Sequence, residues 1–195
     1  MQCPIWGKLG FDMARKERVS RGRSMRPNYF VFCEGETEVA YTETLRAHYR
    51  LPIHVIAKKT LLNVTPELVE RCKSLYVQTS RDRTYLMYDL DVPEMLDRLK
   101  TIQGAELLCS NPCFELWLLL HYSSVRASLT SRACLKRLEA KDPGYRKGVL
   151  SKDMLAGLRE HVGDAIERAK ALPAYLNPST TVYRLVEDLD QLVKV

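Results

Sequence analysis

The stretch Tyr29-Phe30-Val31-Phe32-Cys33-Glu34-Gly35 decides the fold of this 195-residue chain. Its five consecutive apolar residues are typical of a short strand that is buried on both faces of a parallel sheet. An acidic residue and a glycine follow at once, and a helical pattern of apolar residues begins near residue 37. Glycine permits the sharp turn that this order requires. The stretch therefore predicts the first strand-helix unit of an α/β domain.

The same alternation of strand and helix continues along the chain. The predicted strands are residues 29–33, 53–57, 85–88 and 105–109. The helices expected between and after them are residues 37–49, 66–77, 93–102 and 111–122. In the second of these helices, we expect Leu68, Cys72 and Leu75 to face inward. Apolar strands joined by helices imply a four-stranded, mostly parallel sheet that is covered on both faces.

The ends of the chain differ from this core. Residues 1–26 are rich in Lys and Arg and show little apolar periodicity, so we expect a basic, flexible arm. Such an arm would either contact phosphates or only solubilise the protein. The predicted α/β core covers residues 27–125, and a helical extension packing on it covers residues 126–195. Its expected helices are residues 133–140, 152–172 and 180–193.

The composition limits the class of protein. The formal net charge is +6 and the pI is near 9.0, which favours a polyanionic partner such as nucleic acid. No apolar stretch approaches the roughly 20 residues that span a bilayer, and the N-terminus lacks the apolar segment of a signal peptide. The six cysteines form no CxxC pair, so we expect reduced, mostly buried thiols. These features predict a cytoplasmic protein without a membrane partner.

Carboxylates follow two of the predicted strands. Glu34 ends the first strand, and Asp89 and Asp91 end the third. Parallel α/β sheets place their functional groups at the carboxyl ends of the strands. If the first and third strands are neighbours, these ends lie about 5 Å apart. Carboxylates that converge in this way are tolerable around a divalent cation, and Mg²⁺ prefers such oxygen ligands.

Structural roles are also open to these acidic residues. Asp91 could be the N-cap of the third helix, with Glu94 completing a capping box. Glu36 and Glu38 could simply favour the positive end of the first helix. Gly35, in contrast, would bring backbone N–H groups close to a bound phosphate.

A second candidate segment is Ser110-Asn111-Pro112-Cys113-Phe114-Glu115-Leu116-Trp117, which continues to Tyr122. Asn111 is a favourable N-cap and Pro112 a favourable first helical residue. The helix is apolar nearly all round, so Glu115 would be a carboxylate within a buried helix. It could bind metal or act as a general base. It could also only interact with the helix dipole, and His121 reads as structural.

These segments resemble the RloB-like proteins, a bacterial family with a Toprim-type domain. The resemblance lies in Cys33–Glu38, in Asp89-Leu90-Asp91, in Ser110–His121 and in Asn177–Val182. It covers residues from about 26 to 192 and implies a Toprim-like fold. Family members often have a basic residue between the two aspartates, where this chain has Leu90.

The resemblance also implies a function. Glu34 corresponds to the general acid or base of Toprim domains, and Asp89 and Asp91 to the pair that binds Mg²⁺ or Mn²⁺. It implies a nuclease acting on DNA or RNA in anti-phage defence and abortive infection, with a partner ATPase of the ABC type. We expect Lys58, Lys59 and Lys152 to bind the nucleic-acid backbone, and Asn111 and Asn177 to shape the site with Gly35.

Two other functions remain open. The first is a nucleic-acid-binding or sensor subunit without catalysis that works with the ATPase. The second is a nucleotidyl transferase or primase-like enzyme, although no zinc module or evident nucleotide-binding loop is present in the sequence.

Overall fold

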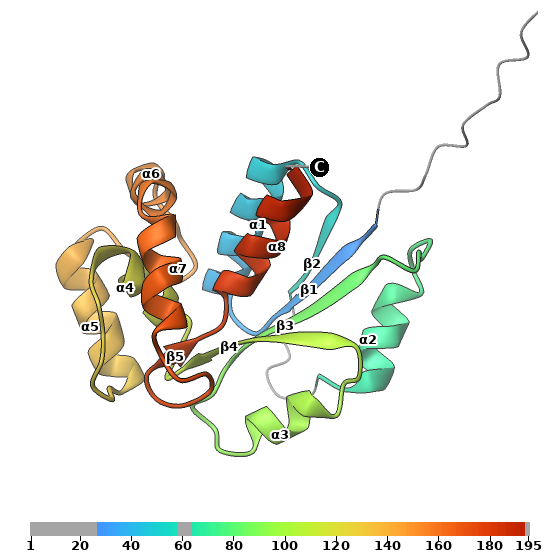
Figure 1. Ribbon diagram of the computed structural model, residues 1–195, viewed down its shortest axis with the longest axis horizontal. Coiled ribbons are helices and arrows are strands. Elements are labelled where there is room, and N and C mark those ends of the chain that lie inside the picture. The colour runs from blue at the N-terminus through green and yellow to red at the C-terminus, as the bar shows by residue number, and fades with distance from the viewer. Residues whose placement is uncertain (1–26, 58–63, 194–195) are drawn as a thin grey trace, which may run out of the picture.

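The structure, a computed structural model, describes residues 27–57 and 64–193. A five-stranded sheet with the order β2-β1-β3-β4-β5 forms its centre, and helices cover both faces (Figure 1). The strands are β1 (Tyr29–Cys33), β2 (Ile53–Ala57), β3 (Arg83–Asp89), β4 (Ala105–Asn111) and β5 (Ser179–Thr180). The helices are α1 (Glu36–Tyr49), α2 (Pro66–Lys73), α3 (Met95–Lys100), α4 (Glu115–Tyr122), α5 (Ser131–Lys141), α6 (Lys152–Glu160), α7 (Val162–Lys170) and α8 (Tyr183–Val193). The α/β class and the mostly parallel sheet are therefore confirmed.

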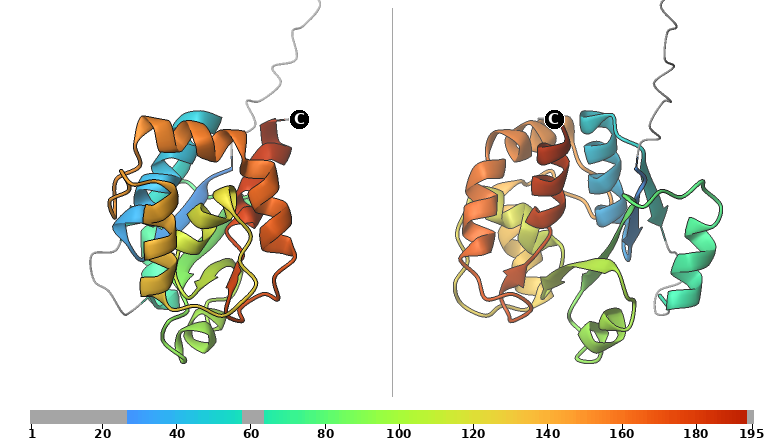
Figure 2. Two further views of the ribbon diagram at one scale, coloured as in Figure 1. Left: turned by 90° about the vertical axis from the view of Figure 1, so that its left-hand side faces the viewer. Right: turned by 45° about the vertical axis from the view of Figure 1, so that its right-hand side comes forward.

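Strand β1 is buried along its whole length because it lies between two parallel neighbours, β2 and β3. Its residues alternate between two apolar cores. Tyr29, Val31 and Cys33 join the larger core with α1, α4 and the C-terminal helices. Phe30 and Phe32 join a smaller core with α2 and α3. Figure 2 shows these layers from two further sides. The continuous apolar run thus reflects burial on both faces.

The sheet has one strand more than the sequence predicts. The short strand β5 pairs antiparallel with the end of β4, with Ser110 opposite Thr180 and Asn111 opposite Ser179. This pairing extends β4 to Asn111, and α4 begins only at Glu115. The expectation that Asn111 caps this helix and that Pro112 opens it is therefore wrong. Two residues of β5 were too few to give a strand pattern of their own.

Other helix boundaries also differ from the prediction. The last helix, expected from residue 180, begins at Tyr183, because Ser179–Thr180 form β5. Helix α2 ends at Lys73 instead of residue 77, and Leu75 is 78% exposed instead of facing inward. The residues after Lys73 do not continue the helix, because the Tyr76 ring packs against Phe30 and His54. The predicted helix 152–172 is two helices, since the backbone of His161 leaves the helical region. In Figure 2, α6 and α7 run in different directions.

Several sequence-based expectations concern residues outside the described part of the chain. The basic arm of residues 1–26 and the two lysines Lys58 and Lys59 belong to this group. The five described cysteines are free thiols, and all of them except Cys72 are buried. Within residues 27–57 and 64–193, no helix has the length and apolar character needed to cross a membrane.

Candidate acidic site at the carboxyl edge of the sheet

The topology brings Glu34 and Asp89 together. Strands β1 and β3 are parallel neighbours in register, with Cys33 opposite Met87. The backbone N–H of Glu34 donates to the carbonyl of Met87 at 3.2 Å. In turn, Oε2 of the Glu34 side chain accepts a hydrogen bond from the backbone N–H of Asp89 at 2.9 Å. Two segments 55 residues apart in sequence thus meet at one point of the sheet edge.

Asp91 lies in the loop after β3 and is exposed. Helix α3 begins at Met95, its N-cap is Glu94, and no side chain caps it. The alternative in which Asp91 caps this helix is therefore wrong. The negative charge of Asp91 nevertheless acts on both Glu34 and Asp89, where it raises the pKa. Asp91 thus stands at the solvent side of the same group of carboxylates.

Glu38 also belongs to this site, although the sequence patterns indicated only a helix-dipole role for it. It is only 3% exposed, on the inward face of α1 that also carries Tyr41 and Leu45. Burial, together with the charges of Glu115 and Glu34, raises the pKa of Glu38 to about 7. The signal was present in the sequence, because residues 38, 41 and 45 share one helical stripe. By contrast, Glu36 in the same turn is exposed.

Gly35 is required by the close approach of Glu38. It is the N-cap of α1, with an extended backbone. A Cβ atom at this position would lie 2.7 Å from Oε2 of Glu38, which is closer than real Cβ contacts come. Any larger residue would displace the Glu38 carboxylate. Gly35 therefore leaves the space in which this side chain sits.

Glu115 is the first residue of α4 and is 5% exposed. The hydroxyl of Tyr145 donates to its Oε1 at 2.9 Å. Tyr145 comes from the loop between α5 and α6, and its hydroxyl also lies 3.3 Å from Oγ1 of Thr37. That threonine oxygen accepts the backbone N–H of Gly148 at 3.0 Å. The loop and the start of α1 thereby hold Glu115 in place.

Five carboxylates therefore form what we call the acidic site: Glu34, Glu38, Asp89, Asp91 and Glu115. Asp89 lies among the other four. Burial, followed by the charges of Glu38, Glu34, Glu115 and Asp91, raises its pKa well above the usual value for an aspartate. Its Oδ1 is buried and has no hydrogen-bond partner within residues 27–57 and 64–193. An unpaired buried carboxylate oxygen is costly unless a cation or a proton compensates it.

Lys147 is the basic residue whose charge acts on this site. It lowers the pKa of both Glu34 and Glu38. Burial lowers the pKa of Lys147 itself, but the carboxylates Glu115, Asp89 and Glu38 outweigh this and leave it raised. No sequence pattern distinguishes Lys147 from the other lysines. The predicted Lys152 is an exposed residue that begins α6, and its role in binding nucleic acid stays a prediction.

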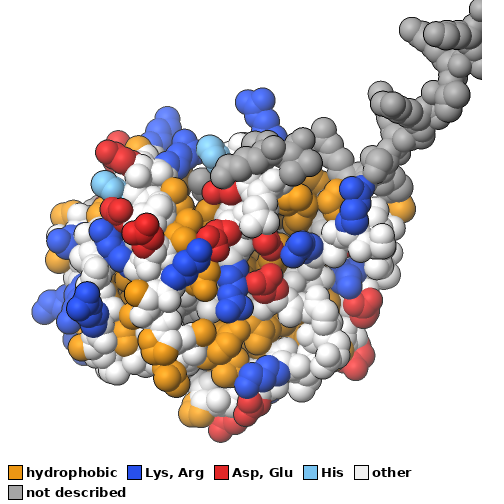
Figure 3. All heavy atoms as spheres, in the orientation of Figure 1, with side chains coloured by type: hydrophobic (Ala, Val, Ile, Leu, Met, Phe, Trp, Pro, Cys, Tyr) orange, Lys and Arg blue, Asp and Glu red, His pale blue; other side chains and the backbone are white. Residues whose placement is uncertain are grey.

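The positive charge of the chain is unevenly distributed. Residues 1–26 contain seven Lys or Arg and two acidic residues, so five of the six surplus positive charges lie there. On the face shown in Figure 3, the basic side chains of the described residues alternate with acidic ones. A polyanion would thus find its main attraction in the N-terminal segment and in local cations such as Lys147.

A divalent metal is compatible with the chemistry of the acidic site. All candidate ligands are carboxylate oxygens, which Mg²⁺ and Mn²⁺ prefer, and Oδ1 of Asp89 is available. Among the described residues, no three His, Cys, Asp or Glu side chains are already arranged around one ion position. Mg²⁺ is commonly held by one or two carboxylates and completes its shell with water. The residues present fit a site of this sparse type.

The two predicted site-shaping asparagines support neighbouring loops. Asn111, at the end of β4, donates from Nδ2 to the carbonyl of Tyr175 at 3.2 Å. Asn177 binds both backbone groups of Leu129: its Oδ1 accepts the N–H at 3.0 Å and its Nδ2 donates to the carbonyl at 2.8 Å. These hydrogen bonds hold the segments around β4 and β5 together. Both asparagine side chains bind backbone groups of neighbouring segments.

Comparisons with known proteins agree with this architecture. Residues 29–189 match the family described as RloB-like protein, and this range contains the whole acidic site. No curated protein and no solved structure matches the chain. A match over most of the sequence, including β1, the β3 edge and α4, shows the relationship directly. The chain belongs to the RloB-like protein family.

Proposed function

We propose that this protein is a metal-dependent nuclease of the Toprim type. The observation that carries the proposal is the acidic site, in which the four other carboxylates act on Asp89, whose buried Oδ1 has no hydrogen-bond partner among the described residues. Such a concentration of negative charge is unfavourable for the folded chain alone. It becomes favourable when a cation is bound, as in enzymes of phosphoryl transfer.

Asp89 and Asp91 are the residues that would hold the cation. Asp89 offers its buried Oδ1, and Asp91 approaches from the exposed loop. When bound, Mg²⁺ or Mn²⁺ supplies Lewis-acid stabilisation of the charge on the phosphoryl oxygens. Tyr145 holds Glu115 by a hydrogen bond, so this carboxylate has the fixed orientation of an outer-shell group.

Glu34 is the proposed general acid or base. Only its Oε2 is engaged with the N–H of Asp89, so Oε1 is the atom proposed to exchange a proton with an attacking water. Burial raises the pKa of Glu34, which brings it closer to the range in which a carboxylate exchanges protons at neutral pH. Lys147 is placed to attract the phosphate backbone of the substrate toward the site.

The proposed substrate is DNA or RNA, and the proposed biological setting is anti-phage defence with an ABC-type ATPase as partner. The excess of basic residues supports a polyanionic substrate. The setting and the partner follow from the family resemblance of the motifs. Copurification of an ABC-type ATPase with the tagged protein from its native host would test this part of the proposal.

The decisive experiment incubates the purified protein with plasmid DNA, single-stranded DNA and total RNA, with Mg²⁺, Mn²⁺ or EDTA. We expect cleavage of at least one substrate with metal and none with EDTA. Asp89→Asn removes one ligand charge at nearly constant volume, and we expect activity to fall at least about 100-fold. Asp97→Asn, at an exposed carboxylate of α3 outside the acidic site, serves as the matched control.

The outcomes separate the alternatives. Nucleic-acid binding that persists in EDTA without any cleavage product would favour the non-catalytic binding subunit over the nuclease. Incorporation of labelled nucleotides would favour a transferase. Equal cleavage by Asp89→Asn and by the wild type would refute the assignment of the site.

A further inference from the structure

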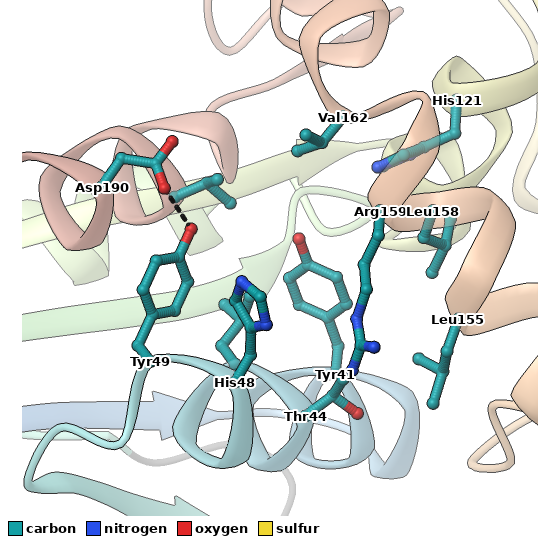
Figure 4. A pocket seen from close by; sticks show the side chains of 12 residues that line it. Tyr41, Thr44, His48, Tyr49, His121, Leu155, Leu158, Arg159, Val162 and Asp190 are labelled. Carbon is teal, nitrogen blue, oxygen red and sulfur yellow. Dashed lines mark hydrogen bonds between the residues drawn. The ribbon is translucent and has the colours of Figure 1, made fainter. Parts of the chain in front are cut away.

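A second candidate site is a cavity between α1, α4, α6 and α8 (Figure 4). Its volume is about 230 Å³. None of the five carboxylates of the acidic site lines it. The family resemblance and the proposed nuclease mechanism assign no role to it. A ligand role for this cavity does not depend on the nuclease function proposed above.

The size and the walls of the cavity suit a flat apolar group. An apolar cavity of about 150 Å³ accommodates benzene, and sites for drug-sized ligands begin near 300 Å³. The volume here lies between these values and is enough for one ring or two fused rings. Leu45, Leu155, Leu158 and Val186 provide much of the wall, and the Tyr41 ring lies against the same space.

His121 offers the cavity a hydrogen-bond acceptor that has no donor among the described residues. His121 is 2% exposed, and its ring points into the cavity in Figure 4. Its Nδ1 lies 2.9 Å from the carbonyl of Trp117, which can only accept, so Nδ1 carries the proton. Burial keeps the ring neutral, and the distal Nε2 then presents a lone pair. Among the described residues, no group donates to it.

The charged residues that line the cavity, Arg159 and Asp190, have opposite signs. Arg159, an exposed residue of α6, also lines the cavity and forms no ion pair within the described part of the chain (Figure 4). Asp190 lies at the opposite end, where its Oδ1 accepts the hydroxyl of Tyr49 at 2.5 Å. An anionic group would be repelled at the Asp190 end and attracted at the Arg159 end. The cavity therefore combines apolar walls, a hydrogen-bond acceptor on His121 and the cation of Arg159.

We propose that this cavity is a binding site for a small planar aromatic anion. The ring lies between the apolar walls, an N–H or O–H group of the ligand donates to Nε2 of His121, and the anionic group pairs with the Arg159 guanidinium. Purine nucleoside monophosphates and indole carboxylates share this chemistry. The two classes differ in the anion, which is a phosphate in one and a carboxylate in the other.

Calorimetric titration of the full-length protein tests the proposal with four probes: AMP, indole-3-acetate, adenosine and inorganic phosphate. We expect at least one of the two aromatic anions to bind with a dissociation constant below about 1 mM, which corresponds to about 4 kcal/mol. If AMP is the ligand, adenosine and phosphate bind at least about tenfold more weakly. Binding of indole-3-acetate alone would identify the carboxylate class.

Three variants locate the binding. Arg159→Met removes the cation and His121→Phe removes the acceptor at similar volume, and each weakens binding about tenfold. Arg132→Met removes an exposed arginine of α5 outside the cavity and leaves binding unchanged. The proposal is overturned if neither aromatic anion binds at about 1 mM, or if both Arg159→Met and His121→Phe bind as the wild type does. Because Arg159 is exposed, its variant reports on binding even where His121→Phe fails to fold.

Discussion

Oε2 of Glu34 accepts a hydrogen bond from the backbone N–H of Asp89 at 2.9 Å. This single contact joins the carboxyl ends of β1 and β3 and places one carboxylate against the backbone that carries another. It also leaves Oε1 of Glu34 and Oδ1 of Asp89 for other partners. A backbone hydrogen bond therefore holds Glu34, while Oδ1 of Asp89 has no partner among the described residues.

The stability of the metal-free protein should depend on the protonation of Glu38. A glutamate in the unfolded chain titrates near pH 4.3, whereas Glu38 in the folded protein has a pKa of about 7. Between these values the folded state binds more protons, so the contribution of Glu38 to stability falls as pH rises. We expect Glu38→Gln to gain on the order of 3 kcal/mol relative to the wild type between about pH 4.5 and pH 8.

Urea unfolding in EDTA at a series of pH values measures this difference. The comparison with the variant is needed because His121 acts in the opposite direction: burial lowers its pKa to about 4, so it destabilises the fold as pH falls through about 6.5. The control is Glu36→Gln, which removes an exposed carboxylate in the same turn of the helix. A difference for Glu38→Gln that does not change with pH would contradict the prediction.

Divalent metal should stabilise the folded protein at about pH 8. A cation that binds only the folded state adds RT ln(1 + [L]/Kd), which is about 1.4 kcal/mol at ten times the Kd. For a chain of this size, we expect Mg²⁺ or Mn²⁺ to raise the melting temperature by about 3–6 °C. Asp89→Asn should lose this response, and Asp97→Asn should retain it. Identical metal responses in both variants would argue against Asp89 as a ligand.

Tyr145→Phe tests the orientation of the Glu115 side chain, because the substitution leaves the carboxylate itself in place. The variant removes only the hydroxyl that donates to Oε1 of Glu115 at 2.9 Å. Because a hydrogen bond to a charged group contributes about 1.5–3 kcal/mol, we expect a loss of stability in that range. We also expect nuclease activity to fall about tenfold, as for a lost outer-shell contact. Tyr122→Phe, at a half-buried tyrosine of the same helix as Glu115, is the control.

Gly35→Ala should disturb the site through Glu38. The new Cβ atom would lie 2.7 Å from Oε2 of Glu38, so the carboxylate must move. We expect metal-dependent activity to fall about tenfold or more, with a modest loss of stability of about 1–2 kcal/mol. Gly163→Ala in α7 is the contrasting variant, since no described atom beyond its chain neighbours and its own helix backbone lies within 4 Å of its Cβ position. It should be neutral or stabilising by up to about 1 kcal/mol, because alanine favours a helix.

Lys147→Met should weaken the interaction with nucleic acid. Lys147 is the cation whose charge lowers the pKa of Glu34 and Glu38. Its loss should reduce nuclease activity about tenfold at low salt and reduce the salt dependence of substrate binding by about one ion. Lys141→Met, at an exposed lysine at the end of α5, removes the same charge elsewhere. Equal effects of the two substitutions would show that only net charge matters.

Sequence patterns alone were enough to predict the sheet and the edge at which Glu34 and Asp89 lie. The apolar strands were recognisable because burial on both faces permits few polar residues. Parallel connection of β1 and β3 then brought Glu34 and Asp89 to one edge. Local boundaries were less predictable, because β5 extends β4 and the contacts of Tyr76 end α2 early.

The remaining residues of the site and the position of the second cavity depend on how the helices pack in three dimensions. Glu38 turns inward because α1 packs on the sheet, and Tyr145 and Lys147 arrive on a loop more than 100 residues later in the chain. His121 and Arg159 line one cavity only because α4 and α6 pack against each other. Periodicity fixes which residues share a face of one element. The free energy of packing decides which faces meet, and that depends on the whole chain.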